Sequence, residues 1–179
     1  MDNLIDAGQI SPVIAVFVEA PNSAQEYARG QRDQFAQMFA EELLPHIDDK
    51  YRTRANAENR LFMGADEGAY AAIYTAFKYP GTASMLAGQS THLYPQAGGD
   101  ELTALVRESE GLSVTFYLDY ATYDTRGDGF HWKDFNESFV ELVKEKGFEL
   151  TSSQVNEGFG FASWRNRSDK ILRTFFSTE

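Results

Sequence analysis

The stretch from Arg60 to Pro80 constrains the fold more than any other part of the chain. A short apolar run, residues 60–63, is followed by a five-residue turn, residues 64–68 (GADEG), with glycine at both ends. Residues 69–79 then carry alanines and apolar side chains at helical spacing. The pattern predicts a buried strand, a tight turn and a helix, because glycine lets a strand and the helix after it pack very closely.

This layout is that of a nucleophile elbow, in which Gly-x-Ser-x-Gly projects one strained residue from the carboxyl end of a strand. The middle residue here is Asp66 and not serine. The alternative interpretation is a plain strand-to-helix loop with an acidic N-cap, since aspartate is common where helices begin. Both interpretations put Asp66 at the carboxyl end of a strand.

The rest of the chain alternates apolar runs with amphipathic stretches. Further strands are predicted at residues 13–18 (VIAVFV), 83–87, 113–120 and 149–155, and further helices at 31–47, 100–108, 132–146 and 163–176. Such alternation indicates one α/β domain over residues 1–179, with a parallel sheet and helices on both faces. A site is expected where the strands end, which is where Asp66, Gln89 and Asp124 fall.

Composition excludes several classes of function. A net charge of −11 argues against binding to nucleic acid or to anionic membranes, because both require clustered Lys and Arg. No apolar run is long enough to span a bilayer, and the first twenty residues do not read as a signal peptide, so the compartment stays open. The chain has no cysteine and three scattered histidines, a pattern that predicts no metal site and no cofactor.

The sequence around the turn resembles the putative-esterase family of α/β-hydrolases. Its enterochelin-esterase-like members carry a Tyr-Arg…Gly-x-Ser-x-Gly-Gly…Tyr-Pro pattern. The corresponding sequence in this chain is YRT-x(5)-NRLFMGADEGAY-AAIYTAFKYP, followed by ASMLAGQS. The similarity continues upstream in PVIAVFVEAPN, EYARG and EELLPHIDDKY, and downstream in YLDYATYD and GFGFASWRNRSDKILRTFF. It therefore covers nearly the whole chain and implies an α/β-hydrolase fold.

The resemblance also implies positions for a nucleophile, an acid and a histidine base. Asp66 stands at the nucleophile position. Asp124 stands at the acid position, and Asp128 is a nearby alternative. The other interpretation of Asp124 is an ordinary turn residue with no role in catalysis. In the family a Gly-x-His-x-x-x-x-Trp pattern supplies the histidine, and counting back from Trp164 puts Phe159 there. Two of the three positions thus carry residues that do not support serine-esterase chemistry.

Four further residues are candidates for contact with a ligand: Glu67, Gln89, His92 and His131. His92 follows the predicted strand that ends at Gln89, and His131 lies seven positions after Asp124. Either histidine is a candidate surrogate for the missing base, although a surface or capping role is the ordinary interpretation. A hard cation held by the carboxylates of Asp66, Glu67 and Asp124 is a weaker alternative.

The resemblance exposes a gap in the predicted sheet. In the family, strands precede the equivalent of residues 13–18, and one of them lies between that strand and the strand before the elbow. Nothing in this chain matches it, so the chain is expected to be a partial domain that lacks N-terminal strands. A missing N-terminal segment or another chain, including a second copy in a homo-oligomer, is expected to complete the sheet, unless the two strands pair directly.

The sequence therefore predicts an esterase-like domain that is inactive as a serine esterase and acts as a ligand-binding or protein-binding module. The expected ligand is a small ester or acyl compound. The alternative is an active carboxylic-ester or acyl hydrolase that uses Asp66 or a surrogate histidine. Asp66 beside Glu67 is expected to disfavour anionic ligands and to tolerate neutral or cationic ones.

Overall fold

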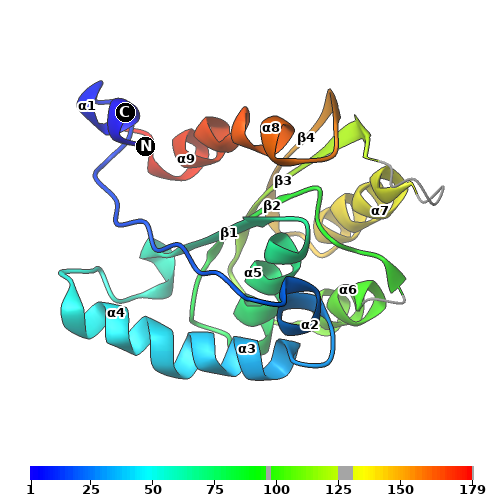
Figure 1. Ribbon diagram of the computed structural model, residues 1–179, viewed down its shortest axis with the longest axis horizontal. Coiled ribbons are helices and arrows are strands. Elements are labelled where there is room, and N and C mark those ends of the chain that lie inside the picture. The colour runs from blue at the N-terminus through cyan, green and yellow to red at the C-terminus, as the bar shows by residue number, and fades with distance from the viewer. Residues whose placement is uncertain (96–97, 125–130, 179) are drawn as a thin grey trace.

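Four parallel strands form the sheet in the computed structural model, which describes residues 1–95, 98–124 and 131–178 (Figure 1). In chain order the strands are β1 (Leu61–Ala65), β2 (Met85–Gln89), β3 (Thr115–Tyr123) and β4 (Glu149–Gly158). They keep this order across the sheet, and every neighbouring pair is parallel. The predicted α/β fold with a parallel sheet is therefore confirmed.

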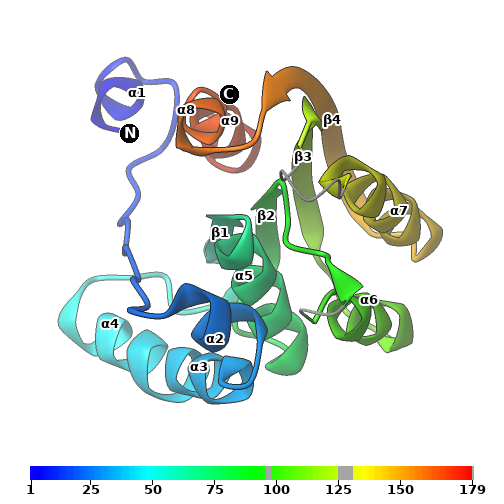
Figure 2. The ribbon, with the colours of Figure 1, turned by 45° about the vertical axis from the view of Figure 1, so that its right-hand side comes forward.

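Helices cover both faces of the sheet (Figures 1 and 2). On one face lie α5 (Glu67–Lys78), α6 (Gly99–Glu108) and α7 (Trp132–Glu145), with α2 (Ser23–Ala28), α3 (Arg32–Met38) and α4 (Leu44–Lys50) outside α5. The other face carries α8 (Phe161–Arg165) and α9 (Ser168–Phe176). The remaining short elements are α1 (Asp2–Asp6), the π-helical turn η1 (Phe39–Leu43), which joins α3 to α4, and the 3₁₀ turn η2 (Ala57–Asn59).

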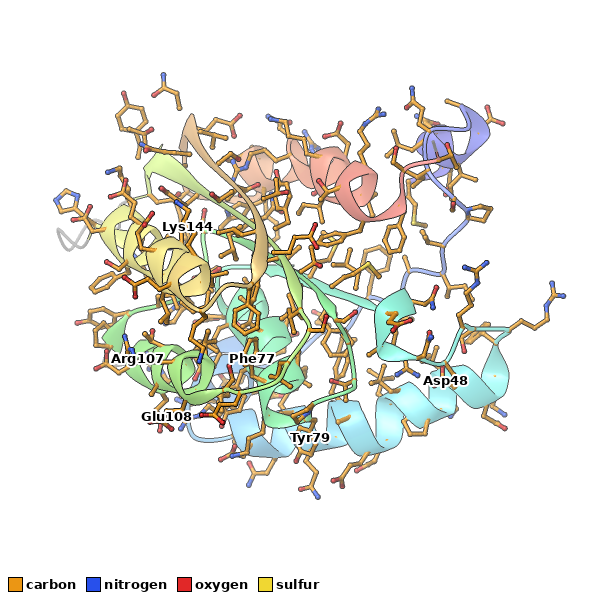
Figure 3. All side chains as sticks on the ribbon, turned by 180° about the vertical axis from the view of Figure 1, so that it is seen from behind. Asp48, Phe77, Tyr79, Arg107, Glu108 and Lys144 are labelled. Carbon is orange, nitrogen blue, oxygen red and sulfur yellow. The ribbon has the colours of Figure 1, made fainter. Side chains whose placement is uncertain are left out.

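The larger hydrophobic core lies between the sheet and helices α5, α6 and α7. Phe77 of α5 is buried at its centre, where its ring lies 6.0 Å from that of Phe116 and 5.8 Å from that of Phe148. Figure 3 shows Phe77 near the middle of the molecule and Arg107 and Glu108 at the side, on the outer end of α6. This packing orients α5 and so fixes the direction in which the turn before it points.

The opposite face of the sheet is covered by a much smaller apolar cluster. Ala87, Tyr117 and Ile171 are its buried members, and Leu61 and Phe175 pack against them. The predicted helix over residues 163–176 is divided here into α8 and α9. The division occurs where Arg167, between the two helices, turns its side chain inward to the Asp119 carboxylate at 3.0 Å.

The prediction of a buried strand at residues 13–18 is wrong. This segment runs as extended coil from α1, past β1, to α2 (Figure 2), and Ile14, Val16 and Phe17 are exposed. No backbone hydrogen bond joins it to β1 among the described residues, so the two do not pair directly. A β-branched run forms a strand only where a neighbour offers backbone partners, and the described part of the chain offers none at this place.

Candidate functional site

The turn between β1 and α5 holds Asp66 in a strained backbone conformation. Its φ of 51° and ψ of −121° make it one of two non-glycine residues with positive φ in the described part of the chain. The Asp66 N–H donates to the Gln89 carbonyl at 3.0 Å, and the Asp66 carbonyl accepts from the His92 N–H at 3.1 Å. These bonds to the β2 end hold the conformation in place and project the side chain from the carboxyl edge of the sheet.

The two glycines of the turn have different structural requirements. A Cβ added to Gly64 would lie 2.3 Å from the carbonyl carbon of Gly68, so only glycine fits there. A Cβ added to Gly68 would meet nothing within 4 Å. The close approach of strand and helix therefore depends on Gly64, and the sequence pattern overstated the role of Gly68.

His92 lies directly against Asp66. Its Nδ1 is 3.1 Å from Asp66 Oδ1, and its side chain is 3% exposed while that of Asp66 is 17% exposed. The imidazole packs edge-on against Trp132, with ring centroids 4.7 Å apart, and its Nε2 has no hydrogen-bond partner in the described part of the chain. The structure thus brings these two predicted site residues together, which sequence spacing alone does not determine.

Asp124 lies at the end of β3 and is fully buried. Its Oδ2 accepts a hydrogen bond from the Ala121 N–H at 2.8 Å, and its carbonyl accepts one from the Trp132 N–H at 3.0 Å. Burial raises the pKa of the Asp124 carboxyl, and hydrogen bonds from Ala121 and Ser90 oppose this only in part. The side chain is therefore an internal carboxyl at the carboxyl end of β3.

Phe159 belongs to a row of aromatic rings that we call the aromatic row: Trp132, Phe159 and Trp164. The Phe159 ring lies 5.6 Å from that of Trp132 and 4.9 Å from that of Trp164. Trp164 Nε1 donates to the Ser90 hydroxyl at 3.1 Å, which ties the row to the loop after β2. The position that the resemblance assigns to a histidine is thus filled by a packed apolar ring.

The remaining candidates lie in different surroundings. Glu67 follows Asp66 and accepts a hydrogen bond from the Ser23 hydroxyl at 2.7 Å. The buried Gln89 amide donates to the Asp119 carboxylate at 3.3 Å and to the Trp164 carbonyl at 3.2 Å. Its hydrogen bonds are therefore internal, and it is not oriented toward the Asp66 carboxylate. His131 is exposed at the start of α7, and Asp128 falls outside the described residues.

A buried amide that sequence reasoning missed positions His92. Asn136 of α7 accepts from the Thr91 N–H at 3.0 Å and donates to the Thr91 carbonyl at 3.0 Å. A third bond, from the Asn136 amide to the Trp132 carbonyl at 3.0 Å, lies within α7 and holds the amide in this orientation. The sequence does contain a sign of this role. Asn136 is a polar residue on the otherwise apolar face of an amphipathic helix, and an amide buried there must be hydrogen-bonded.

The described residues contain neither a cluster of metal-ligating side chains nor a membrane-spanning helix. No group of three or more His, Asp or Glu side chains there is placed to hold a metal ion, so the cation alternative is not favoured. Within the same residues, no helix has the length and apolar character needed to cross a bilayer.

The chain is similar to known proteins in family, in sequence and in structure. A family model described as "Putative esterase" matches residues 1–141. The endo-1,4-beta-xylanase/feruloyl esterase of Xylanibacter ruminicola is 24% identical over an alignment 184 residues long, which covers 98% of this chain and 23% of that protein. The chain therefore spans less than a quarter of the length of this curated relative.

Solved structures of two esterases are similar in fold. The enterobactin esterase FES from Shigella flexneri, in the presence of 2,3-di-hydroxy-N-benzoyl-glycine, matches with a TM-score of 0.78 at 19% identity, over 97% of this chain and 46% of that one. The ferulic acid esterase AmCE1/Fae1A from Anaeromyces mucronatus matches with a TM-score of 0.71 at 16% identity, over 97% of this chain and 68% of that one. At these identities the likeness establishes the fold alone.

Proposed function

Because the chain belongs to the putative-esterase family of α/β-hydrolases, we propose that its site at the elbow binds a neutral ester without acting as a serine esterase. The observation that carries this proposal is the packing of Phe159 between Trp132 and Trp164. A serine esterase needs a proton carrier between its acid and its nucleophile. Phe159 has no proton to carry, and Asp66 replaces the hydroxyl that would attack.

The class of ligand follows from the side chains at the elbow and from the relatives. Trp132 and Trp164 are buried in the aromatic row, whereas Phe159 between them is half-buried, so its ring is the apolar surface that the row offers to an aromatic ligand. The names of similar proteins refer to feruloyl and dihydroxybenzoyl compounds, which are aromatic acyl groups. Asp66 and Glu67 add negative charge, so a neutral aromatic ester is favoured over its free acid.

A second candidate function is hydrolysis that uses Asp66 and His92, and the 3.1 Å contact between them favours it. In this scheme the Asp66 carboxylate attacks the acyl carbon, and the departing alkoxide takes a proton from the His92 imidazolium. The resulting mixed anhydride is then cleaved by a water that gives a proton to His92. We rank it second because His92 bonds the attacking carboxylate itself and is nearly fully buried, which limits access of water.

Two measurements on the purified chain test the proposal. Tryptophan fluorescence is expected to report binding of methyl ferulate, and ferulate is expected to bind more weakly. Spectrophotometry with 4-nitrophenyl acetate is expected to show no turnover above the rate without protein, both for the wild type and for Glu108→Ala, a control variant at an exposed position on α6. Turnover that is lost in both Asp66→Ala and His92→Phe, but kept in Glu108→Ala, would replace the binding proposal with the second candidate.

A further inference from the structure

Phe161, the first residue of α8, places a large apolar ring in solvent. It is 86% exposed, whereas Trp164, three residues later in the same helix, is buried. The Phe161 ring meets the Trp164 indole edge-on, with ring centroids 5.4 Å apart and an interplanar angle of 73°. An edge-on contact leaves at least one face of a ring uncovered, so Phe161 presents an open aromatic face.

Ring contacts connect Phe161 to the elbow. The His92 imidazole, which contacts the Asp66 carboxylate, packs against Trp132, the first member of the aromatic row. Phe161 packs against Trp164, the last member of the row. The series begins at a nearly buried imidazole and ends at an exposed phenylalanine. The open face of Phe161 is therefore continuous with the candidate site.

Phe159 and Phe161 pack against the same indole. Their rings stand at 81° and 73° to that of Trp164. Gly160 between them has a φ of 135° and a ψ of 174°, a conformation that residues with a side chain rarely adopt. A Cβ added to Gly160 would meet nothing within 4 Å, so the space beside it is open. Phe161 thus extends the half-buried surface of Phe159 outward.

The indole beneath Phe161 is held firmly. Its Nε1 donates to the Ser90 hydroxyl at 3.1 Å. The Trp164 carbonyl accepts from the Gln89 amide at 3.2 Å and from the Ser168 hydroxyl at 3.1 Å. The base of the exposed ring is therefore fixed before any ligand arrives, which reduces the entropy lost on binding.

We propose that Phe161 is a specificity-determining residue whose ring stacks on the aromatic ring of the ligand and so selects aromatic esters over aliphatic ones. The inference rests on the proposed function, because it concerns the ester held at the elbow. An aromatic ring gains a stacking contact with Phe161 in addition to burial. An aliphatic chain gains burial alone.

A second copy of the chain is a less suitable partner for this ring. The exposed residues near it in sequence include Asn156, Arg165 and Asn166, which are polar or charged. A stable interface between proteins buries about 800 Å² on each side, with apolar residues at its centre. One phenylalanine among polar neighbours does not supply such a centre, but it matches one planar ring of a small ligand.

Isothermal titration calorimetry of the full chain with methyl ferulate and methyl hexanoate tests the inference. Phe161→Leu keeps an apolar side chain without an aromatic face, and it is expected to weaken methyl ferulate binding by about three- to tenfold. Methyl hexanoate is expected to bind more weakly to the wild type, and equally weakly to Phe161→Leu. Phe161→Tyr keeps the aromatic face and is expected to bind methyl ferulate as the wild type does.

The matched control is Tyr51→Leu, which removes another exposed ring at the end of α4, away from α8 (Figure 1). It is expected to bind both esters as the wild type does. If the wild type does not bind methyl ferulate, the proposed function and this inference are both wrong. If the wild type binds it and Phe161→Leu binds it equally, or loses affinity for both esters alike, only this inference is overturned. A concentration-dependent dimer that Phe161→Leu dissociates would assign the ring to a second copy and would also overturn it.

Discussion

His92 Nδ1 lies 3.1 Å from Asp66 Oδ1, and this contact joins the two loops that follow β1 and β2. The Asp66 carbonyl also accepts from the His92 N–H, so backbone and side chain both link the same two residues. The Asp66 carboxylate therefore already has one interaction partner within the fold, the His92 imidazole. A carboxylate held in this way is a poorer nucleophile than a free one, which agrees with a binding role for the elbow.

The first prediction concerns the stability that this contact provides. Asp66→Ala is expected to lower the free energy of unfolding by about 1–3 kcal/mol, because His92 would then be buried with no partner on either ring nitrogen. Asp66→Asn keeps an acceptor at the same place and is expected to lose less. Urea unfolding followed by circular dichroism measures both, with Glu108→Ala as a control expected to stay within about 0.5 kcal/mol of the wild type.

A second prediction compares the two glycines of the elbow. Gly64→Ala is expected to destabilise the fold by about 3 kcal/mol or more, since its Cβ would overlap the backbone of Gly68. Gly68→Ala is expected to be neutral or to stabilise by about 0.5–1 kcal/mol, because the residue lies in α5 with open space around it. Thermal unfolding of the two variants measures the difference. Equal losses would show that the turn is not as tight as described.

A third prediction follows from the buried carboxyl of Asp124. Burial raises its pKa in the folded state, so its contribution to stability is fully present below the unfolded pKa of about 3.9 and is lost as pH rises through the folded pKa. Asp124→Asn cannot ionise and is expected to be more stable than the wild type at about pH 7, with the gap closing toward about pH 4. Denaturant midpoints across this range measure the gap, and a gap that widened toward acid would contradict the assigned direction.

A fourth prediction concerns the buried guanidinium of Arg167, which bonds the Asp119 carboxylate at 3.0 Å and that of Glu157 at 2.9 Å. Arg167→Met is expected to lower the free energy of unfolding by about 3–5 kcal/mol, because it leaves the buried Asp119 carboxylate without its cation and with only the Gln89 amide as a side-chain hydrogen-bond donor. Arg173→Met removes an exposed ion pair from α9 and is expected to cost less than about 1 kcal/mol. Chemical denaturation compares the two. The double variant Arg167→Met with Asp119→Leu is expected to recover much of the loss.

The fold was predictable where local pattern and packing agree. Residues 60–80 have the glycine, the apolar strand and the helical spacing of a tight βα unit, and the structure forms it. Residues 13–18 have the same β-branched character but no backbone partner in the described chain, and strand formation depends on that partner. Sequence pattern reports the side chains of a segment but not the presence of a neighbour.

The site was predictable only in part, because contacts between parts of the chain far apart in sequence decide which residues meet there. Asp66 was identified by its turn, whereas its contact with His92 joins residues 26 positions apart. Arg167 lies in a charged stretch of the sequence that resembles a solvated helix face, yet its side chain is almost fully buried. The inward turn of that side chain depends on Asp119 at the middle of another strand, which no local pattern reveals.

The last prediction restores the two altered positions of the triad together. Asp66→Ser supplies a hydroxyl in the strained conformation of the elbow, and Phe159→His supplies an imidazole at the place that the family pattern assigns to the base. Asp124 is already buried at the end of β3 and next to the backbone of Trp132. The double variant is therefore expected to hydrolyse 4-nitrophenyl acetate at least about tenfold faster than either single variant, because nucleophile and base act as one unit.

The matched control for this gain is the same pair of substitutions combined with Asp124→Asn, which removes the charge that would stabilise an imidazolium. This triple variant is expected to return close to the background rate while binding methyl ferulate as the double variant does. If the double variant binds the ester but stays at background, the altered side chains are not what prevents turnover. The cause would then lie in the backbone around the elbow, which holds residue 66 at a φ of 51° and a ψ of −121°.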